Sequence, residues 1–247
     1  MQVADEHNTP RERTSAPFLL HGSTTCRVQQ WSYRSDVAQL VLYLQRAIPT
    51  PHDLAQWCQH LTALGFRTVR TSAVNAAAAP VFEQAGFLVT QELALLEHTD
   101  VRGAAATMSA HDRTRRMSPR ERQRVAAIDM AAFGEQWAMD DTALHDVCAA
   151  TPRHRSRVAG DPFRAFAISG RDGRLGFLQR LGVHPDVQRQ GLGWALVADS
   201  LAWMARWQVQ RVLVNTPVDN DAALTLYHRA GYHRLPEVLR VYERGLA

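Results

Sequence analysis

Lysine is absent from this chain of 247 residues, so all 28 basic residues are arginine. The protein therefore offers no lysine side chain that it could itself modify. Cysteine is scarce, with three residues that lie far apart and form no C-x-x-C pair: Cys26, Cys58 and Cys148. Such a sparse, odd set argues against a disulfide framework and a zinc cluster, and it favours a reducing compartment. No metal site is expected.

Long apolar runs are absent as well. No stretch approaches the roughly 20 residues that a membrane-spanning helix needs, so no membrane partner is expected. Residues 1–14 are polar and charged and lack the apolar segment of a signal peptide, which predicts a disordered arm on a cytoplasmic protein. With 46% hydrophobic and 21% charged residues, the chain is typical of one large or two small globular domains.

The net charge is only +4, but the arginines are clustered. They gather in two segments: Arg113, Arg115, Arg116, Arg120, Arg122 and Arg124, and then Arg153, Arg155 and Arg157. Such clusters can attract nucleic acid or an acidic partner. No aromatic residues are interleaved with them, which favours solvated surfaces, and no nucleic-acid partner is expected.

The most informative segment is 188–193, with the sequence Gln-Arg-Gln-Gly-Leu-Gly. It follows the apolar run 181–183 and precedes the amphipathic segment 194–207, so it predicts a strand, a short loop and a helix. The first N–H groups of a helix lack intrahelical partners, and the helix dipole adds partial positive charge there. Gly191 and Gly193 leave room for a phosphate to approach. The alternative is a tight turn without a ligand.

A regular alternation of elements surrounds this loop. Segment 211–215 is typical of a short strand, and Asn220 of the N-cap of a second helix. Gly231 ends that helix, and Tyr232 begins another strand. Upstream, residues 112–183 predict a strand, two helices and three further strands. The pattern indicates a mixed α/β fold.

Three motifs, in matching order and spacing, resemble the acetyl-CoA-binding core of the GNAT (GCN5-related) N-acetyltransferase superfamily. They are Val183-His184-Pro185, Gln188-x-x-Gly191-x-Gly193 and Asn220-Asp221-x-Ala223-x-x-Leu226-Tyr227-x-x-x-Gly231-Tyr232. The resemblance is firm over about 175–235 and extends over 112–247. It implies the GNAT fold, a splayed central mixed sheet flanked by helices, and acetyl-CoA as cosubstrate.

The resemblance also implies where acetyl-CoA binds. The pantetheine arm would pair with the strand at 175–184, as an added strand does, where this strand splays from the one at 211–215. The backbone N–H of Leu181 is the expected oxyanion donor, and that of Val183 is a second contact. The pyrophosphate would bind the amides of Gln188, Arg189, Gln190, Gly191, Leu192, Gly193 and Trp194.

The second helix would add contacts from Asn220, Ala223 and Tyr227. Tyr227 matches the tyrosine that acts as general acid toward the leaving thiolate in this family. The general base is less defined, because residues 177–180 carry no carboxylate although many relatives have a glutamate there. Glu135 is a weak candidate. Further candidates are Asp140, Asp141 and His184.

A fainter copy of this pattern of strands and helices occurs earlier in the chain. A shift of 145 positions places Val69 on Val214, Asn75 on Asn220, Phe82 on Tyr227, Gly86 on Gly231 and Phe87 on Tyr232. The copy lacks the glycine loop at the equivalent residues 43–48, and its phenylalanine has no proton to donate. We predict a degenerate GNAT-like domain at 15–100 without a cofactor site, a linker at 101–111 and a catalytic domain at 112–247.

These observations predict an acetyl-CoA-dependent N-acetyltransferase that moves the acetyl group directly from the thioester to a primary amine in a ternary complex. The acceptor is a small-molecule or protein amine, and the protein is a monomer or a homodimer. Two alternatives stay open. The missing carboxylate supports a non-catalytic acyl-CoA-binding or regulatory module, and the tandem layout supports a small-molecule acetyltransferase similar to the mycothiol synthases.

Overall fold

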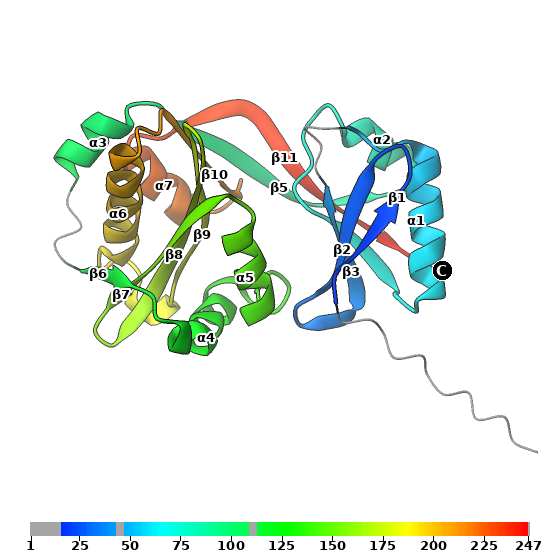
Figure 1. Ribbon diagram of the computed structural model, residues 1–247, viewed down its shortest axis with the longest axis horizontal. Coiled ribbons are helices and arrows are strands. Elements are labelled where there is room, and N and C mark those ends of the chain that lie inside the picture. The colour runs from blue at the N-terminus through cyan, green and yellow to red at the C-terminus, as the bar shows by residue number, and fades with distance from the viewer. Residues whose placement is uncertain (1–15, 43–46, 109–112, 247) are drawn as a thin grey trace, which may run out of the picture. The chain divides into compact units, whose positions relative to one another are not determined.

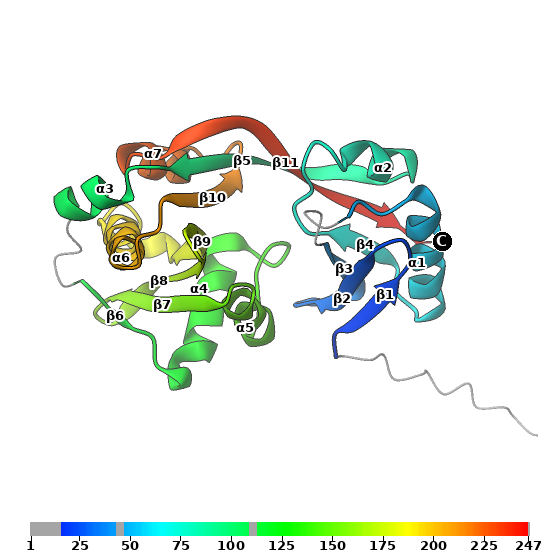
Figure 2. The same cartoon turned by 45° about the horizontal axis from the view of Figure 1, so that its top comes forward.

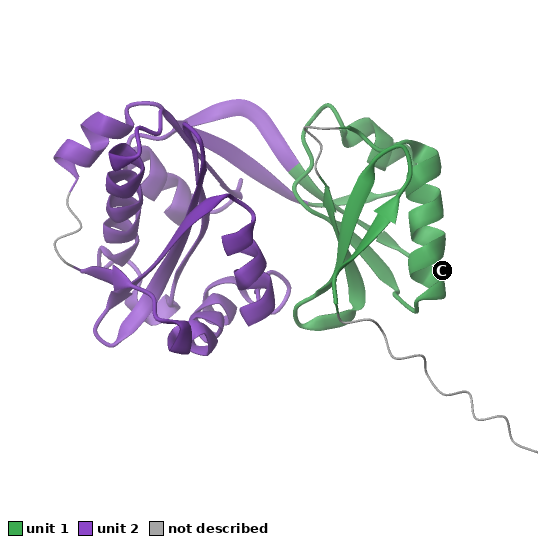
Figure 3. Cartoon of the chain, in the orientation of Figure 1, with its two compact units in different colours: residues 1–90, 240–247 green, residues 91–239 purple. Residues whose placement is uncertain are grey.

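The computed structural model describes residues 16–42, 47–108 and 113–246, which form two compact units (Figure 3). Unit 1 contains the chain up to Thr90 together with Arg240–Ala247, and unit 2 contains Gln91–Leu239. The arm expected at 1–14 lies outside the described residues. Within the described ranges, no helix is long and apolar enough to cross a membrane.

Unit 1 is built on a mixed sheet with the strand order β1-β2-β3-β4-β11. Its elements from the first part of the chain are β1 (Phe18–His21), β2 (Thr25–Trp31), β3 (Arg34–Leu42), α1 (Pro51–Ala63), β4 (Thr68–Thr71) and α2 (Ala79–Gln84). The face of α1 that packs on the sheet is apolar and buried, with Leu54, Trp57 and Leu61 at its centre. Burial of these side chains holds the helix in place.

Unit 2 contains a longer sheet with the strand order β11-β5-β10-β9-β8-β7-β6. Its strands are β5 (Leu88–His98), β6 (Thr114–Arg116), β7 (Arg153–Gly160), β8 (Phe163–Asp172), β9 (Leu175–Val183), β10 (Arg211–Pro217) and β11 (His233–Gly245). Its helices are α3 (Val101–Thr107), η1 (Pro119–Glu121), α4 (Arg122–Phe133), α5 (Asp141–Ala149), η2 (Pro185–Val187), α6 (Leu192–Arg206) and α7 (Asp221–Arg229). One face of the sheet is covered by α6, and the other by α4 and α5 (Figures 1 and 2). The predicted mixed α/β fold is confirmed.

The long helix α6 is fixed by its core face and by one buried carboxylate. Leu201 and Met204 are fully buried in the core beneath the helix. Asp199 is 8% exposed, and it accepts hydrogen bonds from Arg155 on β7 and Thr114 on β6, both at 2.8 Å. These charge-assisted bonds tie α6, and with it the loop before it, to the edge of the sheet.

The linker expected at 101–111 is wrong in its first part, because Val101–Thr107 form α3. Asp100 accepts the N–H of Gly103 at 3.0 Å and so caps this helix. Val101 is 2% exposed and packs into the core beneath α6. The Ala- and Gly-rich composition of this segment did not indicate that Val101 is buried in the core. Residues 109–112 lie outside the described part of the chain.

Each unit contains a strand from the other sequence copy. In unit 1, β4 pairs antiparallel with β11, and Arg70 lies opposite Glu243. In unit 2, β10 pairs antiparallel with β5, and Asn215 lies opposite Leu95. The 145-residue repeat places β4 on β10 and β5 on β11, so equivalent strands are exchanged. The unit boundaries therefore fall within β5 and β11, and not at the ends of the expected domains 15–100 and 112–247.

Candidate active site

In unit 2, strand β9 parts from β10 after its first three residues. The two strands run parallel and pair through Leu175–Phe177 and Arg211–Leu213 only. Farther along, β10 pairs with β5, and β9 continues to Val183 alongside β8. In the described part of unit 2, the other edge of β9 has no strand partner beyond residue 177. An extended, amide-rich ligand can add to such an edge as a strand would.

The hydrogen-bond pattern of β9 decides which backbone groups face the splay, the space between β9 and β10 beyond their last paired residues. In an antiparallel pair, residues that hydrogen bond the partner strand alternate with residues that do not. The N–H of His184 donates to the carbonyl of Arg164 at 2.9 Å, in register with the β8–β9 pairs. By this alternation Gly182 bonds β8, whereas the N–H groups of Leu181 and Val183 point toward the splay.

The loop after β9 passes through left-handed conformations before α6 begins. Arg189 has a φ of 59°, and Gly191, the N-cap of α6, has a φ of 80°. No described side chain caps this helix end, so the N–H groups of Leu192, Gly193 and Trp194 stay available. Backbone amides in such a conformation form a concave anion-binding nest, which the helix dipole reinforces.

Close packing favours a glycine at position 193. A Cβ there would lie 3.1 Å from Cδ2 of Leu226 on α7 and 3.7 Å from Cγ2 of Val183 on β9. Gly193 thus lets the first turn of α6 approach both neighbouring elements. Gln188, Arg189 and Gln190 are exposed, so a ligand can reach this loop from solvent.

Helix α7 brings Asn220, Ala223 and Tyr227 beside α6. The side-chain oxygen of Asn220 accepts the N–H of Ala223 at 3.1 Å, so the predicted N-cap is confirmed. Tyr227 is 5% exposed and belongs to the core beneath α6. Burial raises the pKa of its hydroxyl, which therefore stays protonated at neutral pH. The group is a donor and not a base.

The core around Tyr227 includes a set of ring contacts that sequence reasoning missed. The ring of Tyr232 lies 5.7 Å from that of Tyr227, and the ring of His98 meets Tyr232 edge-on at 5.1 Å. His98 belongs to β5, the strand from the other sequence copy. Within the described residues, the Tyr232 hydroxyl and His98 Nδ1 are buried without a hydrogen-bond partner. The 145-residue repeat does not predict the contact between His98 and Tyr232.

A β-bulge turns two polar residues of β9 to the same face. The register shifts between Ile168 and Ser169 of β8, which leaves Gln179 as the extra residue of β9. Gln179 Nε2 donates to the carbonyl of Val147 on α5 at 2.9 Å. Arg180 points to the neighbouring helix α4, where it pairs with the fully buried Asp129. This ion pair joins residues 51 positions apart, and no local sequence signal predicts it.

The candidates for the general base differ in the contacts and the exposure of their side chains. Asp140 caps α5 by accepting the N–H of Ala143 at 2.8 Å. The ring of His184 lies 2.7 Å from Nη2 of Arg164. Asp141 lies in the first turn of α5, and Glu135 is exposed between α4 and α5. The base role of Glu135 stays a prediction.

The corresponding helix of unit 1 has a closed N-terminus. Asp53 and Thr50 form a complete capping box at the start of α1, and Ser23 donates to Asp53 through both its N–H and its hydroxyl. Burial of Asp53 opposes ionisation, but the hydrogen bonds from Ser23 and Thr50 outweigh it and hold the pKa below its usual range. A buried carboxylate thus stands near a helix start whose counterpart in unit 2 is uncapped. Residues 43–46, in the register of the glycine loop, lie outside the described residues.

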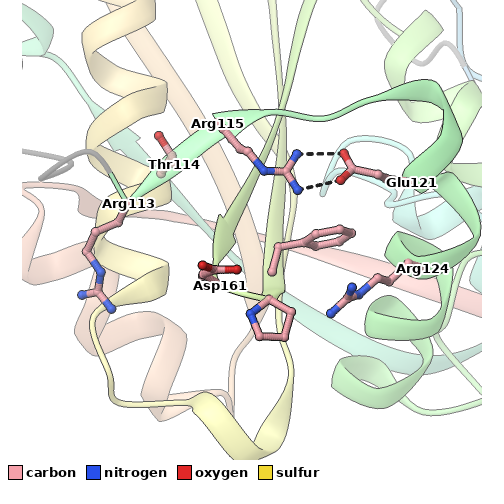
Figure 4. Close-up of a pocket in the computed structure, with 9 residues that line it drawn as sticks. Arg113, Thr114, Arg115, Glu121, Arg124 and Asp161 are labelled. Carbon is pink, nitrogen blue, oxygen red and sulfur yellow. Dashed lines mark hydrogen bonds and ion pairs between the residues drawn. The ribbon is translucent and has the colours of Figure 1, made fainter.

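A cavity of about 480 Å³ adjoins the glycine loop (Figure 4). Residues of β6, η1, α4 and the β7–β8 turn line it. Arg115 and Glu121 form a bidentate ion pair at 3.0 and 2.6 Å on its wall. Arg113 Nη1 lies 2.9 Å from the position of a Cβ on Gly191, so this wall touches the loop. Among the described residues, no cluster of three or more potential metal ligands occurs.

Comparison with known proteins extends the motif evidence. The acetyltransferase (GNAT) family model matches residues 123–232, all within unit 2. The chain is 43% identical over 60 residues to a mycothiol acetyltransferase of Geodermatophilus obscurus, covering 24% of this chain and 20% of that protein. It is 31% identical over 70 residues to N-alpha-acetyltransferase 30 of Schizosaccharomyces pombe, covering 28% and 47%. The matched segments thus span less than half the length of these curated relatives.

Solved structures share the fold over most of the chain. A GCN5-related N-acetyltransferase from Sphaerobacter thermophilus has a TM-score of 0.60 and 16% identity, covering 90% of this chain and 76% of its own. A tandem GNAT protein from the clavulanic acid biosynthesis pathway has a TM-score of 0.63 and 11% identity, covering 90% and 79%. At these identities the likeness concerns the fold. Residues 123–232 of this chain therefore form a domain of the GNAT acetyltransferase family.

Proposed function

We propose that the protein is an acetyl-CoA-dependent N-acetyltransferase that moves the acetyl group directly to a primary amine in a ternary complex. The observation that carries the proposal is the continuity of one backbone surface. The N–H groups of Leu181 and Val183 face the splay, and the left-handed loop and the uncapped start of α6 follow directly. This surface suits an amide-rich arm that ends in a pyrophosphate. Membership of the GNAT superfamily supports acetyl transfer in general.

Residues of this surface have distinct roles in the proposed reaction. Acetyl-CoA supplies the activated acetyl group. The N–H of Leu181 stabilises the negative oxygen that forms when a neutral amine adds to the thioester carbonyl. Tyr227 would donate its proton or a hydrogen bond to the departing sulfur as the carbon–sulfur bond breaks. The proton of the amine passes to Glu135 or to solvent.

The amides of residues 188–194 would hold the pyrophosphate, with Asn220 and Ala223 beside them on α7. Trp194 is half-buried at the start of α6, and Arg229 lies over its ring at 5.7 Å. We propose one acetyl-CoA per chain, bound by unit 2. The capped start of α1 and the carboxylate of Asp53 support this, because negative charge at that position repels a phosphate.

A monomer or a homodimer is proposed, and sedimentation at several concentrations distinguishes them.

A mycothiol-synthase-like acceptor is a second candidate within the same chemistry. Its support is the 43% identity over 60 residues to a mycothiol acetyltransferase. The test is release of the CoA thiol from acetyl-CoA, followed by chromatography so that a thiol on the acceptor does not interfere. The panel of amines includes an amine that carries a thiol, an alanine-initial peptide and simple alkyl amines. Amine-dependent thiol release supports a transferase, and the best amine identifies the class of acceptor.

Calorimetry with CoA completes this test. Tight CoA binding without transfer to any amine would favour the non-catalytic binding module. If CoA does not bind at all, the proposed cosubstrate is wrong. Size-matched alkyl amines serve as the control, since they offer an amine without any further recognition group.

A further inference from the structure

We infer that Arg180 recognises an oxygen atom adjacent to the acceptor amine, so that the preferred acceptors are α-amino carbonyl compounds such as amino acid amides and peptide N-termini. The inference rests on the proposed function, because it concerns the acceptor side of the same site. It begins from the bulge at Gln179, which turns the side chain of Arg180 toward α4. The next residue, Leu181, presents its N–H to the splay. The guanidinium therefore extends from the strand one residue away from the proposed oxyanion donor.

One edge of the Arg180 guanidinium is fixed by protein partners. Its Nε and Nη2 donate to the two carboxylate oxygens of Asp129 at 2.7 and 2.8 Å. Nη2 also donates to the carbonyl of Trp137 at 2.9 Å. One face of the group lies over the ring of Phe133, with Cζ 3.5 Å from the ring centroid. These contacts hold the guanidinium in a single orientation.

The anchor of Arg180 is itself rigid. Asp129 is fully buried, and its Oδ1 accepts the N–H of Met139 at 2.7 Å. The pair thus fastens the segment between α4 and α5 at two points, the carbonyl of Trp137 and the N–H of Met139. A guanidinium held rigidly in this way is suited to positioning a substrate. We regard Asp129 as a positioning residue that acts through Arg180.

The other edge of the guanidinium remains available. Arginine carries five N–H donors, and the two on Nη1 of Arg180 have no hydrogen-bond partner within the described residues. The side chain is 13% exposed, and Nη1 is not among the buried atoms that lack partners, so solvent reaches it. Because Asp129 already neutralises the charge, this edge suits one carbonyl or carboxylate oxygen better than a multiply charged anion.

The test compares two acceptors that differ in that oxygen, L-alaninamide and isopropylamine. Rates are compared as kcat/KM for the free-amine form, because the two amines have different pKa values. We expect the wild-type protein to prefer alaninamide by about tenfold or more, the usual effect of a hydrogen bond from a charged donor. Arg180→Lys keeps the positive charge but loses the planar fork, and it should abolish the preference. The affinity of this variant for acetyl-CoA should stay within about twofold, because the Arg180 side chain contacts Asp129, Trp137 and Phe133 and none of the residues proposed to bind the cosubstrate.

Two further variants guard against a merely structural effect. Arg124→Lys is the matched control, because Arg124, on α4, likewise lies over a phenylalanine ring, that of Phe163, at 4.4 Å. It should retain the wild-type preference. Asp129→Asn keeps Arg180 but removes its charged anchor, and it should raise KM for alaninamide more than it lowers kcat. Thermal unfolding establishes that each variant is folded.

The outcomes separate this inference from the proposed function. If the wild-type protein acetylates both amines equally well, or if Arg180→Lys keeps the preference, the role of Arg180 is wrong and the transferase function stands. If no amine is acetylated, the proposed function fails, and the inference fails with it.

Discussion

Arg70 and Glu243 lie 173 positions apart in the chain and form an ion pair inside unit 1. Arg70 is 1% exposed, and its guanidinium also lies 4.6 Å from the ring centroid of Trp31. Beside this pair, Tyr242 is fully buried and stacks on Phe82 at a centroid distance of 5.8 Å. The end of β11 is therefore a core element of the unit formed mainly by the first part of the chain.

Loss of this strand should unfold unit 1. Tyr242→Ala should lower the free energy of unfolding by about 3–5 kcal/mol, as large aromatic-to-alanine changes in cores do. Leu19→Ala is the control, since Leu19 is 54% exposed on β1 and should change it by less than about 0.5 kcal/mol. Urea unfolding with hydrogen exchange resolved by segment measures both. Unchanged protection of β4 in Tyr242→Ala would contradict the role of the exchanged strand.

The glycine loop offers a test of cosubstrate placement. Gly191→Asp should abolish CoA binding, because a carboxylate would stand against the pyrophosphate. The Cβ that carries it would lie 2.9 Å from Arg113 Nη1, so Arg113 could pair with the new carboxylate. Gly173→Asp is a matched control: Gly173 is also left-handed, with a φ of 56°, but its Cβ would meet nothing within 4 Å. It should bind CoA like the wild-type protein. Equal affinities in calorimetry would falsify the placement.

Tyr227→Phe should lower kcat by about 10²–10⁴-fold with little change in CoA affinity, since it removes a proton donor and leaves the ring. Tyr232→Phe is the control, because the Tyr232 hydroxyl is buried in the same core without a partner among the described residues. Its loss should be neutral or mildly stabilising. A wild-type rate in Tyr227→Phe would exclude the acid role, and an equal loss in both variants would point to packing.

The pH profile should follow the acceptor amine and not the tyrosine. Transfer requires the neutral amine, so kcat/KM should rise with pH up to the pKa of the amine. An ordinary tyrosine ionises near about pH 10, which would then lower the rate. Burial raises the pKa of Tyr227, so no fall should appear near that pH. A descending limb below pH 10 that is lost in Tyr227→Phe would contradict this expectation.

Asp53 should contribute to the stability of unit 1 at neutral pH but not in acid. Its pKa is lower in the folded protein than the ordinary value of about 3.9, so its contribution is complete above that pH and is lost as pH falls toward the folded value. Asp53→Asn should cost about 1–2 kcal/mol at pH 7, as the loss of a helix cap does. The difference from wild type should shrink below about pH 4.

Urea unfolding across pH 3 to 7 measures this difference. Asp36→Asn is the control, because Asp36 is 37% exposed in a surface pair with Arg34 and should have little effect. A difference between wild type and Asp53→Asn that stays constant down to pH 3 would exclude the proposed role of the ionised carboxylate.

Local sequence signals predicted much of unit 2 because they act over a few residues. Asn220 caps α7 through an N–H three residues away, and Gly191 takes a conformation that glycine adopts readily. The Arg180–Asp129 pair could not be predicted, because it depends on a bulge and on the packing of α4 against β9. The exchange of strands between the two sequence copies could not be predicted for a similar reason. The repeat identifies β5 and β11 as equivalent, but a strand pattern does not specify its partner.

During synthesis, a ribosome completes residues 16–90 long before it reaches residues 240–246. Over that interval β4 has an open edge, because the strand that pairs with it and the carboxylate of Glu243 do not yet exist. Unit 2 has all of its strands once residue 239 has emerged. The part of the protein made first is therefore the part completed last. Until then its exposed edge can pair with other chains, so chaperone binding to the nascent protein should centre on β4.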